Sequence, residues 1–211
     1  MYKFKNKSYG VIAVIYYCIF ILGLLLSGIL YQKGYTHFSY IYDALFVLGV
    51  SIVLIKDKNL RSLGFSKEKI KSNLLISSVI VAASFIIVLI FSGLSFYQAF
   101  TKLIYYLFYI AAVEEILFRG FIQNYLFGFK LNKYIIFIIG AVFFALIHIP
   151  FQMYVHNDVS VHYIITAVPN LIQCFLFHLL MCYITYKRKD IIIPIAFHCA
   201  FDYLGLVIQL F

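Results

Sequence analysis

The sequence predicts an all-α fold, a polytopic membrane helix bundle of about seven transmembrane helices in a single domain, residues 1–211. Three observations predict this class. Apolar residues make up 64% of the chain and charged residues 12%, whereas ordinary globular domains have about 45–50% and about 25%. The mean hydropathy is +0.99. Apolar runs long enough to cross a bilayer, about 20 residues, recur along the chain without a linker or an internal repeat.

Seven apolar runs are the candidate spans. Three of them, the second, fifth and sixth, are short or interrupted by polar residues, so the expected range is six to eight helices. The first run is longer than the apolar region of a cleavable signal peptide and lacks a clear small-residue cleavage site, so we expect it to be retained. The fourth and fifth runs flank a turn expected at 128–132. The runs cover residues 11–30, 40–55, 74–91, 99–126, 134–149, 169–186 and 191–211.

The distribution of basic residues predicts the orientation of the bundle. If seven spans alternate, fourteen of the 17 Lys and Arg residues fall on one side, in the N-terminal tail and after the second, fourth and sixth runs. Cytoplasmic loops carry such an excess, so we expect a cytoplasmic N-terminus and an external C-terminus. The long external segment, 150–168, has no basic residue.

The net charge of +9 does not indicate a nucleic-acid partner, because the basic residues lie in short clusters between apolar runs. Membrane lipid is the partner that this composition indicates, and no particular oligomeric state is favoured. The cysteines lie in apolar runs without CxxC spacing, which favours small core residues over disulfide or zinc ligands. They are Cys18, Cys174, Cys182 and Cys199.

Ionisable residues at membrane depth are the main functional signal, because the hydrocarbon penalises each one that is not paired or hydrated. Five of the eight acidic residues fall in loops or near a span end and have structural interpretations. His178, in the sixth run, is expected to be structural or to line a cavity. The other ionisable residues at depth are Glu114, Glu115, Arg119, His148, His198 and Asp202.

Helical spacing predicts that this set converges. Three pairs are four residues apart and so share a helix face: Glu115 with Arg119, Phe144 with His148, and His198 with Asp202. Glu114 is turned about 100° from its neighbour, which makes it the carboxylate less neutralised by the arginine. Glu114 and His148 are each 17 residues from position 131 of the hairpin, and are therefore expected at equal depth. The last pair is expected at a comparable depth, so three helices supply one buried site.

This set suits hydrolysis without a covalent nucleophile. A carboxylate in a low-dielectric pocket can act as a general base towards water, and a histidine with a polar neighbour can stabilise an oxyanion. On this interpretation Glu114 activates water, His198 stabilises the tetrahedral intermediate, and no cofactor is required. The alternative is a zinc site with Glu114, His148 and His198 as ligands, although no HExxH motif supports a standard zinc protease.

At these residues the sequence resembles the CPBP family, the CAAX proteases and bacteriocin-processing enzymes also called the Abi family. The three motifs of that family are EExxxR, FxxxH and HxxxN or HxxxD. All three occur here in order on separate predicted helices, as Glu114-Glu115-Ile-Leu-Phe-Arg119, Phe144-Ala-Leu-Ile-His148 and His198-Cys-Ala-Phe-Asp202. The resemblance covers about residues 100–205, which we expect to be the catalytic core.

The resemblance implies a glutamate-dependent intramembrane endopeptidase similar to a CAAX prenyl protease. It makes Glu114 the general base, with His148 helping to position the water, and His198 with Asp202 the oxyanion-stabilising pair. Glu115 and Arg119 would hold the site together, supported by Phe144. Many relatives have Asn where this chain has Asp202, so we expect that carboxylate to orient His198 and to stabilise its charged form.

The implied substrate is a membrane-associated peptide or a lipidated protein. The abundance of Ile, Lys, Asn, Phe and Tyr indicates an AT-rich genome, which favours a bacterial plasma membrane and a role in peptide or bacteriocin processing or self-immunity. One alternative is a non-catalytic membrane scaffold or immunity protein that keeps the site. A proton-coupled transporter is less favoured, because such proteins more often show internal repeats.

Overall fold

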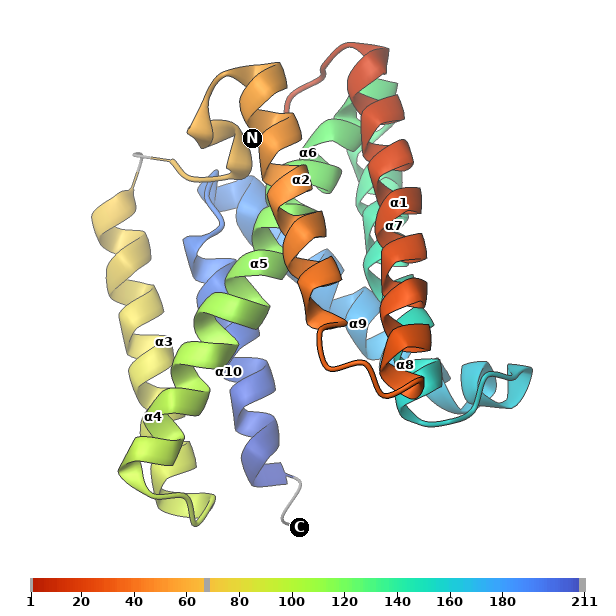
Figure 1. Cartoon of the computed structure of the whole chain (residues 1–211). Helices are drawn as coiled ribbons and strands as arrows, with labels where there is room; N and C mark the ends of the chain where they lie inside the picture. Colours follow the sequence, from red (N-terminus) through yellow and green to blue (C-terminus); the bar gives the residue numbers. More distant parts are fainter. Residues whose placement is uncertain (1, 67–68, 209–211) are drawn as a thin grey trace.

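The computed structural model describes residues 2–66 and 69–208, and within these ranges every regular element is a helix. The long helices run up and down in alternation and confirm the predicted all-α membrane bundle (Figure 1). The main helices are α1 (Lys7–Gln32), α2 (Ser39–Asp57), α3 (Ile70–Phe91), α4 (Phe96–Ile104), α5 (Ala112–Glu115), α6 (Gln123–Leu126), α7 (Lys133–Leu146), α8 (Pro150–Val155), α9 (Val161–Arg188) and α10 (Ile192–Ile208).

The seven expected spans correspond to seven helical rods. Five are long and apolar enough to cross a membrane by length and composition: α1, α2, α3, α9 and the segment Lys133–Val155. The fourth rod is helical from Phe96 to Leu126, where two π-helical stretches, η2 (Tyr105–Ala111) and η3 (Ile116–Ile122), separate α4, α5 and α6. The seventh rod, α10, is apolar but shorter, and residues 209–211 of that predicted run lie outside the described residues.

The region between the fifth and sixth runs differs from the prediction. The segment 150–168, expected to be a loop, contains α8 and the first two turns of α9. Pro169, expected to begin the sixth span, lies inside α9 instead. The nitrogen of Pro169 cannot donate an intrahelical hydrogen bond, and this part of α9 is largely exposed.

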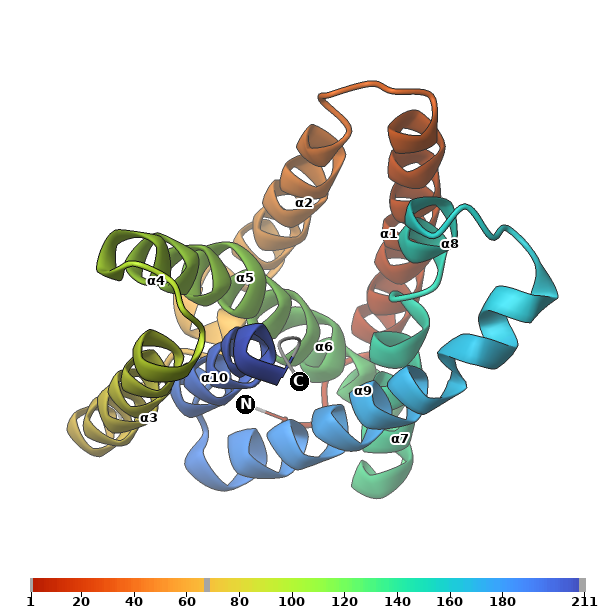
Figure 2. The same cartoon turned by 90° about the horizontal axis from the view of Figure 1, so that it is seen from below.

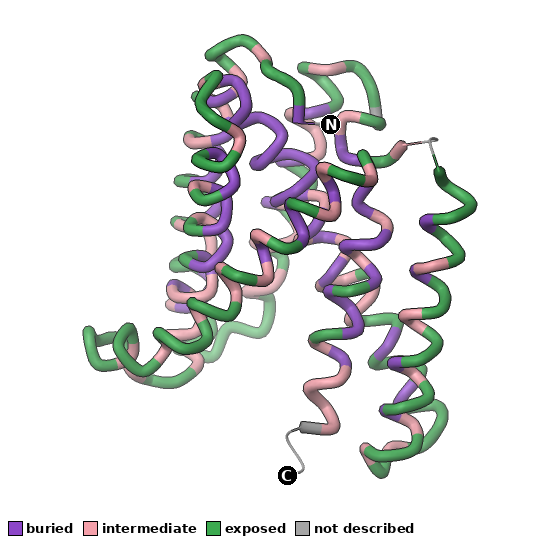
Figure 3. The backbone as a smooth tube through the Cα atoms, turned by 180° about the vertical axis from the view of Figure 1, so that it is seen from behind, coloured by how far each residue is buried: buried purple, intermediate pink, exposed green. Residues whose placement is uncertain are grey.

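The fourth rod, which contains Glu114 and Glu115, passes through the middle of the bundle. Seen from below, α5 and α6 lie at the centre, with the α1–α2 hairpin on one side, α3 and α10 on another, and α7 and α9 on the third (Figure 2). Buried positions follow the inner faces of these helices, while the outward faces are exposed (Figure 3). The exposed residues include many large apolar side chains, among them Ile55, Leu75 and Ile165, as a lipid-facing surface requires.

One end of the bundle gathers the basic segments. The N-terminal segment, the connection after α2, the α6–α7 turn and the α9–α10 turn lie near this end, and α10 ends toward the opposite one (Figure 1). Asp190 joins two of these connections, because its carboxylate accepts from the backbone N–H of Ser66 (2.8 Å) and of Ile192 (2.6 Å). Burial raises the pKa of Asp190 above its ordinary value, and the two N–H donors oppose that effect.

Candidate active site

The two adjacent glutamates lie on a short α-helical stretch of the central rod. Helix α5 is four residues long and is flanked on both sides by π-helical turns. Such turns add a residue to a helical turn and often occur at functional sites. Gly120 allows the next part of the rod to pack closely, because a Cβ there would lie 2.1 Å from the Leu63 carbonyl oxygen. The backbone of the α2–α3 connection therefore packs directly against the fourth rod at Gly120, the residue after Arg119.

Glu115 and Arg119 form the ion pair that their spacing predicts. Arg119 Nη1 lies 2.8 Å from Glu115 Oε1, and neither side chain is exposed. The guanidinium also lies over the ring of Phe144, 4.5 Å from its centroid, which is a cation–π contact from the second motif. A fully buried ion pair is a poor source of stability, because the desolvation of both charges opposes their attraction. Its presence here therefore indicates a functional site.

His198 completes a buried triad with this ion pair. Its Nδ1 lies 2.7 Å from Glu115 Oε1, the same oxygen that faces Arg119. The sequence predicted that Asp202 would orient His198, and this assignment was incomplete, because Glu115 holds the inner nitrogen of the ring. Helical spacing could not reveal the contact, since Glu115 and His198 are 83 positions apart and lie on different rods.

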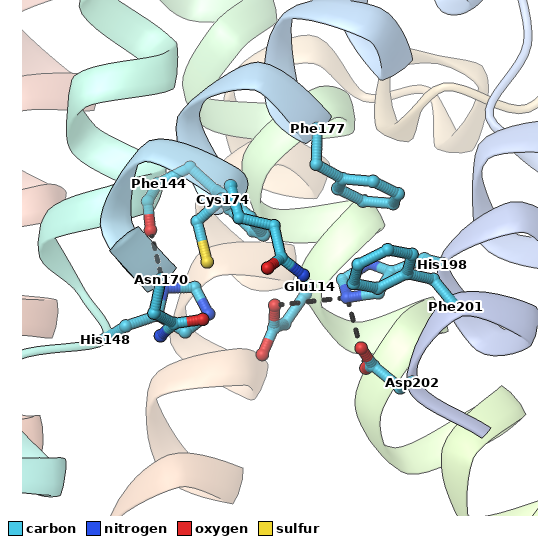
Figure 4. Close-up of a pocket in the computed structure, with 10 residues that line it drawn as sticks. Glu114, Phe144, His148, Asn170, Cys174, Phe177, His198, Phe201 and Asp202 are labelled. Atoms are coloured by element: carbon cyan, nitrogen blue, oxygen red, sulfur yellow. Dashed lines mark hydrogen bonds and ion pairs between the residues drawn. The ribbon is translucent and has the colours of Figure 1, made fainter. Parts of the chain in front are cut away.

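The outer nitrogen of His198 faces two more carboxylates. Its Nε2 lies 3.4 Å from Asp202 Oδ2 and 3.7 Å from Glu114 Oε2, and Figure 4 shows the ring between these side chains. A ring with carboxylates at both nitrogens donates from both, which favours the doubly protonated form. The two distances at Nε2 are longer than those of a strong charge-assisted hydrogen bond, so this N–H is available to another acceptor.

His148 approaches the Glu114 carboxylate from the side opposite to His198 (Figure 4). It was expected within the fifth helix, but α7 ends at Leu146 and His148 lies in the turn before Pro150. The reason is that Pro150 has no N–H to donate to the Leu146 carbonyl oxygen, which is bonded by the Ile149 N–H in a tighter turn instead. His148 Nδ1 lies 2.9 Å from the Phe144 carbonyl oxygen. Because that oxygen can only accept, Nδ1 carries a proton and donates to it.

A cavity of about 150 Å³ joins these groups. Its polar lining includes Glu114, His148, His198 and Asp202, all predicted from the sequence. Glu115 and Arg119 lie behind it. The sequence analysis missed the wall that α9 contributes, which consists of Asn170, Gln173, Cys174 and Phe177. Their spacing of three, four and seven residues places them on one helix face, and this pattern was the signal that could have identified them.

A second cavity, of about 330 Å³, meets the first at Glu114 and His148. Its walls come from α1, α2, η2 and α8 and are mostly aromatic and aliphatic, including Phe20, Phe38 and Phe151. Beside it, the Tyr109 hydroxyl donates to the Asp43 carboxylate over 2.9 Å. Glu114 thus lies between a polar cavity and an apolar one.

A further polar layer lies behind Arg119. His178 is fully buried, and its Nε2 lies 3.2 Å from Gln123 Oε1, while Gln123 Nε2 donates to the Ile136 carbonyl oxygen. Gly140 makes room for this pair, because a Cβ there would lie 1.7 Å from Gln123 Oε1. His178 is therefore structural, one of the two roles that the sequence left open, and it does not line either cavity.

The other ionisable groups have structural surroundings. Asp57 pairs with Lys5 over 3.0 Å, and Asp158 contacts Ser160 and His162 near the start of α9. His156 and His162 are exposed, as expected for ordinary surface residues. The predicted loop acid Glu68 lies outside the described residues.

The alternative zinc site is not supported by the side-chain arrangement. In the described part of the chain, no group of three His, Cys, Asp or Glu side chains is placed to hold a metal ion. His148 and His198 approach Glu114 from opposite sides, and His198 directs one nitrogen to Glu115. Glu114, His148 and His198, the three ligands that the sequence suggested, are therefore not arranged to bind one metal ion together.

The helical bundle and the site together define an integral membrane protein with acidic and histidine side chains buried at its centre. Comparison with protein families matches residues 96–204, just over half of the chain, to the family described as type II CAAX prenyl endopeptidase Rce1-like. The chain belongs to this peptidase family, as its motifs predicted. No curated protein and no solved structure matches the chain.

Proposed function

We propose that the protein is an intramembrane, glutamate-dependent endopeptidase that hydrolyses a peptide bond without a metal or another cofactor. The observation that carries the proposal is the position of Glu114 between two histidines, at the junction of two cavities. Its carboxylate forms no hydrogen bond through Oε2 within the described residues, although this atom is buried. A buried carboxylate oxygen without a donor suits a group that binds and deprotonates water.

In the proposed reaction, Glu114 removes a proton from a water that also donates to Nε2 of His148. The oxygen of that water forms a bond to the carbonyl carbon of the substrate, and the carbonyl oxygen becomes an oxyanion. The Nε2–H of His198 donates to this oxyanion, with Asp202 beside it. The carbon–nitrogen bond then breaks, and the proton held by Glu114 passes to the leaving amine.

Glu115 and Arg119 position the reacting groups rather than contacting the substrate. Glu115 holds Nδ1 of His198, and Arg119 balances the charge of Glu115. Because Nδ1–H of His198 donates to Glu115, the Nε2–H on the other side of the ring is directed at the cavity. Phe144 supports the pair through its ring, and its carbonyl oxygen selects the tautomer of His148.

We further propose that the substrate is a membrane-associated peptide or a lipidated protein, and that the enzyme acts in a bacterial plasma membrane in peptide or bacteriocin processing or in self-immunity. Membrane lipid surrounds the apolar outer faces of the helices. The apolar cavity beside Glu114 supports a substrate with apolar groups near the bond that is cleaved.

Replacing Glu114 by Gln is the decisive experiment, because the amide keeps the size of the side chain and cannot accept a proton. General-base catalysis contributes about 10²–10⁴-fold to a rate, and we expect peptide cleavage by the purified protein to fall by that factor. Cleavage is measured by mass spectrometry on peptides recovered from cells with and without the gene, and on synthetic copies of those peptides.

Asp158→Asn is the matched control, since it removes one carboxylate from the surface segment between α8 and α9. We expect this variant to cleave at the wild-type rate. Full activity in Glu114→Gln would refute the peptidase proposal and leave a scaffold or immunity role.

A further inference from the structure

A third cavity lies at the basic end of the bundle and takes no part in the proposed reaction. Its volume is about 250 Å³, and its lining residues are Lys3, Lys5, Arg61, Ser62 and Asn124. These residues come from three segments that are distant in sequence: the N-terminal segment, the 3₁₀ turn η1 (Leu60–Leu63) and α6. The fold has therefore gathered three basic side chains around one hollow.

The N-terminal segment is anchored at this place. Tyr2 is buried and its ring stacks on Phe127, with 5.3 Å between the centroids. The backbone N–H of Tyr2 donates to Asn124 Oδ1 over 3.0 Å, and Asn124 Nδ2 donates to the Ser62 carbonyl oxygen over 3.2 Å. One buried amide of α6 thus holds both segments that supply the basic residues.

The charges around the cavity are not balanced. Lys5 is compensated by Asp57, at 3.0 Å. The side chains of Lys3 and Arg61 form no ion pair, hydrogen bond or ring contact with any part of the chain that the structure describes. Among the residues that the structure describes, none that lines the cavity is acidic. Two uncompensated cations that face one hollow produce a local positive potential, which attracts an anion.

We propose that this cavity binds the phosphate group of an anionic phospholipid. The basic end of a membrane helix bundle lies at the level of the lipid headgroups, where pockets of basic residues bind such groups. Phe4, between Lys3 and Lys5, is 64% exposed. Its ring lies 6.3 Å from that of Phe127, and an exposed aromatic side chain beside the cavity favours a lipid phosphate over a free phosphate ion.

Lipid binding to the purified full-length protein in detergent tests the proposal. Phosphatidylglycerol, phosphatidylcholine and inorganic phosphate are titrated separately, and the complexes are counted by native mass spectrometry. A basic residue that contacts the headgroup contributes about fivefold in affinity, so removing both charges that line the cavity, in Lys3→Gln with Arg61→Gln, is expected to weaken phosphatidylglycerol binding about 25-fold. Phosphatidylcholine and inorganic phosphate are expected to bind the wild type more weakly than phosphatidylglycerol does.

The matched control is Lys130→Gln with Arg188→Gln, which removes the same two charges from the same end of the bundle but outside the cavity. We expect its phosphatidylglycerol affinity to stay within about twofold of the wild type, since these charges do not line the hollow. A second measurement needs no variant. In wild-type protein, phosphatidylglycerol should slow acetylation of Lys3 and leave that of Lys130 unchanged.

Equal weakening in both double variants would overturn the proposal, because it would indicate diffuse attraction by the whole basic end. Inorganic phosphate that binds as tightly as phosphatidylglycerol would overturn the lipid as occupant. Equal protection of Lys3 and Lys130 would do the same for the position of the site. These readouts do not depend on peptide cleavage, so the outcome is independent of the proposed enzymatic function.

Discussion

The two cavities that meet at Glu114 differ in both chemistry and origin. The smaller one, about 150 Å³, is lined by the histidines, by Asp202 and by the polar side chains of α9. The larger one, about 330 Å³, is lined mainly by apolar and aromatic residues. The walls of the smaller cavity lie within the matched family region, 96–204, whereas α1 and α2, which form much of the larger one, lie outside it.

This difference separates two tasks of the proposed enzyme. His198 and Asp202 line only the smaller cavity, and His148 is shared by both. The larger cavity offers shape and a mostly aromatic and aliphatic surface. Substitutions on the polar side should therefore change the rate of hydrolysis, and substitutions on the apolar side should mainly change which substrates are accepted.

The largest effect on the polar side is expected from Glu115→Gln. The amide leaves Arg119 buried without its counterion and weakens the hold on His198, and removal of one partner from a buried pair costs about 3–5 kcal/mol. We expect a drop in the free energy of unfolding in detergent, measured by titration with a denaturing detergent, together with loss of peptide cleavage.

Asp57→Asn serves as the comparison, because it also removes a carboxylate from an ion pair, but one near the end of the bundle where Lys5 is partly exposed. There we expect a smaller loss than for Glu115→Gln, because Lys5 keeps partial access to water whereas Arg119 has none. Similar losses in the two variants would show that burial of the Glu115 pair has no special importance.

Gly140→Ala should produce the next largest effect, by disturbing the layer behind Arg119. A methyl group at this position would clash with Gln123 Oε1, and overpacking of this kind costs about 1–3 kcal/mol. The free energy of unfolding and the cleavage rate should both fall. Gly205→Ala is the control, since a Cβ there meets no atom of the described residues within 4 Å. Alanine at that helical position should be neutral or slightly stabilising, and a larger loss at Gly205 than at Gly140 would contradict the packing account.

The sequence predicted the fold class, the seven rods and the six ionisable residues, because apolar run length and spacing of four are local properties. It did not predict that Glu115 holds His198, since this contact joins two rods whose relative rotation depends on packing. The polar face of α9 was missed for a different reason. Asn170, Gln173 and Cys174 belong to no motif. The span was also expected to begin at Pro169, so the helical residues before it were not included when the pattern was read.

Asp202→Asn tests whether Asp202 or Glu115 is the carboxylate that His198 requires. Because Glu115 already orients His198, and because an amide can donate to an oxyanion, we expect a loss of less than about tenfold in kcat, the scale of one weak polar contact. The rate should be followed across pH. Inactivity at every pH would contradict this expectation and assign the carboxylate a role that an amide cannot fill.

The smallest effect is expected on the apolar side, from Tyr109→Phe. This substitution removes the hydroxyl that donates to Asp43 and leaves the aromatic ring at the wall of the larger cavity. A partly exposed hydrogen bond contributes about 0.5–1.5 kcal/mol, so the unfolding free energy should change by no more than that. The cleavage rate of a peptide with small side chains should be unchanged, because neither histidine loses a partner. If Tyr109→Phe instead reduced kcat for every peptide as strongly as Asp202→Asn, the apolar side would contribute to the chemistry, and the division of tasks at Glu114 would be wrong.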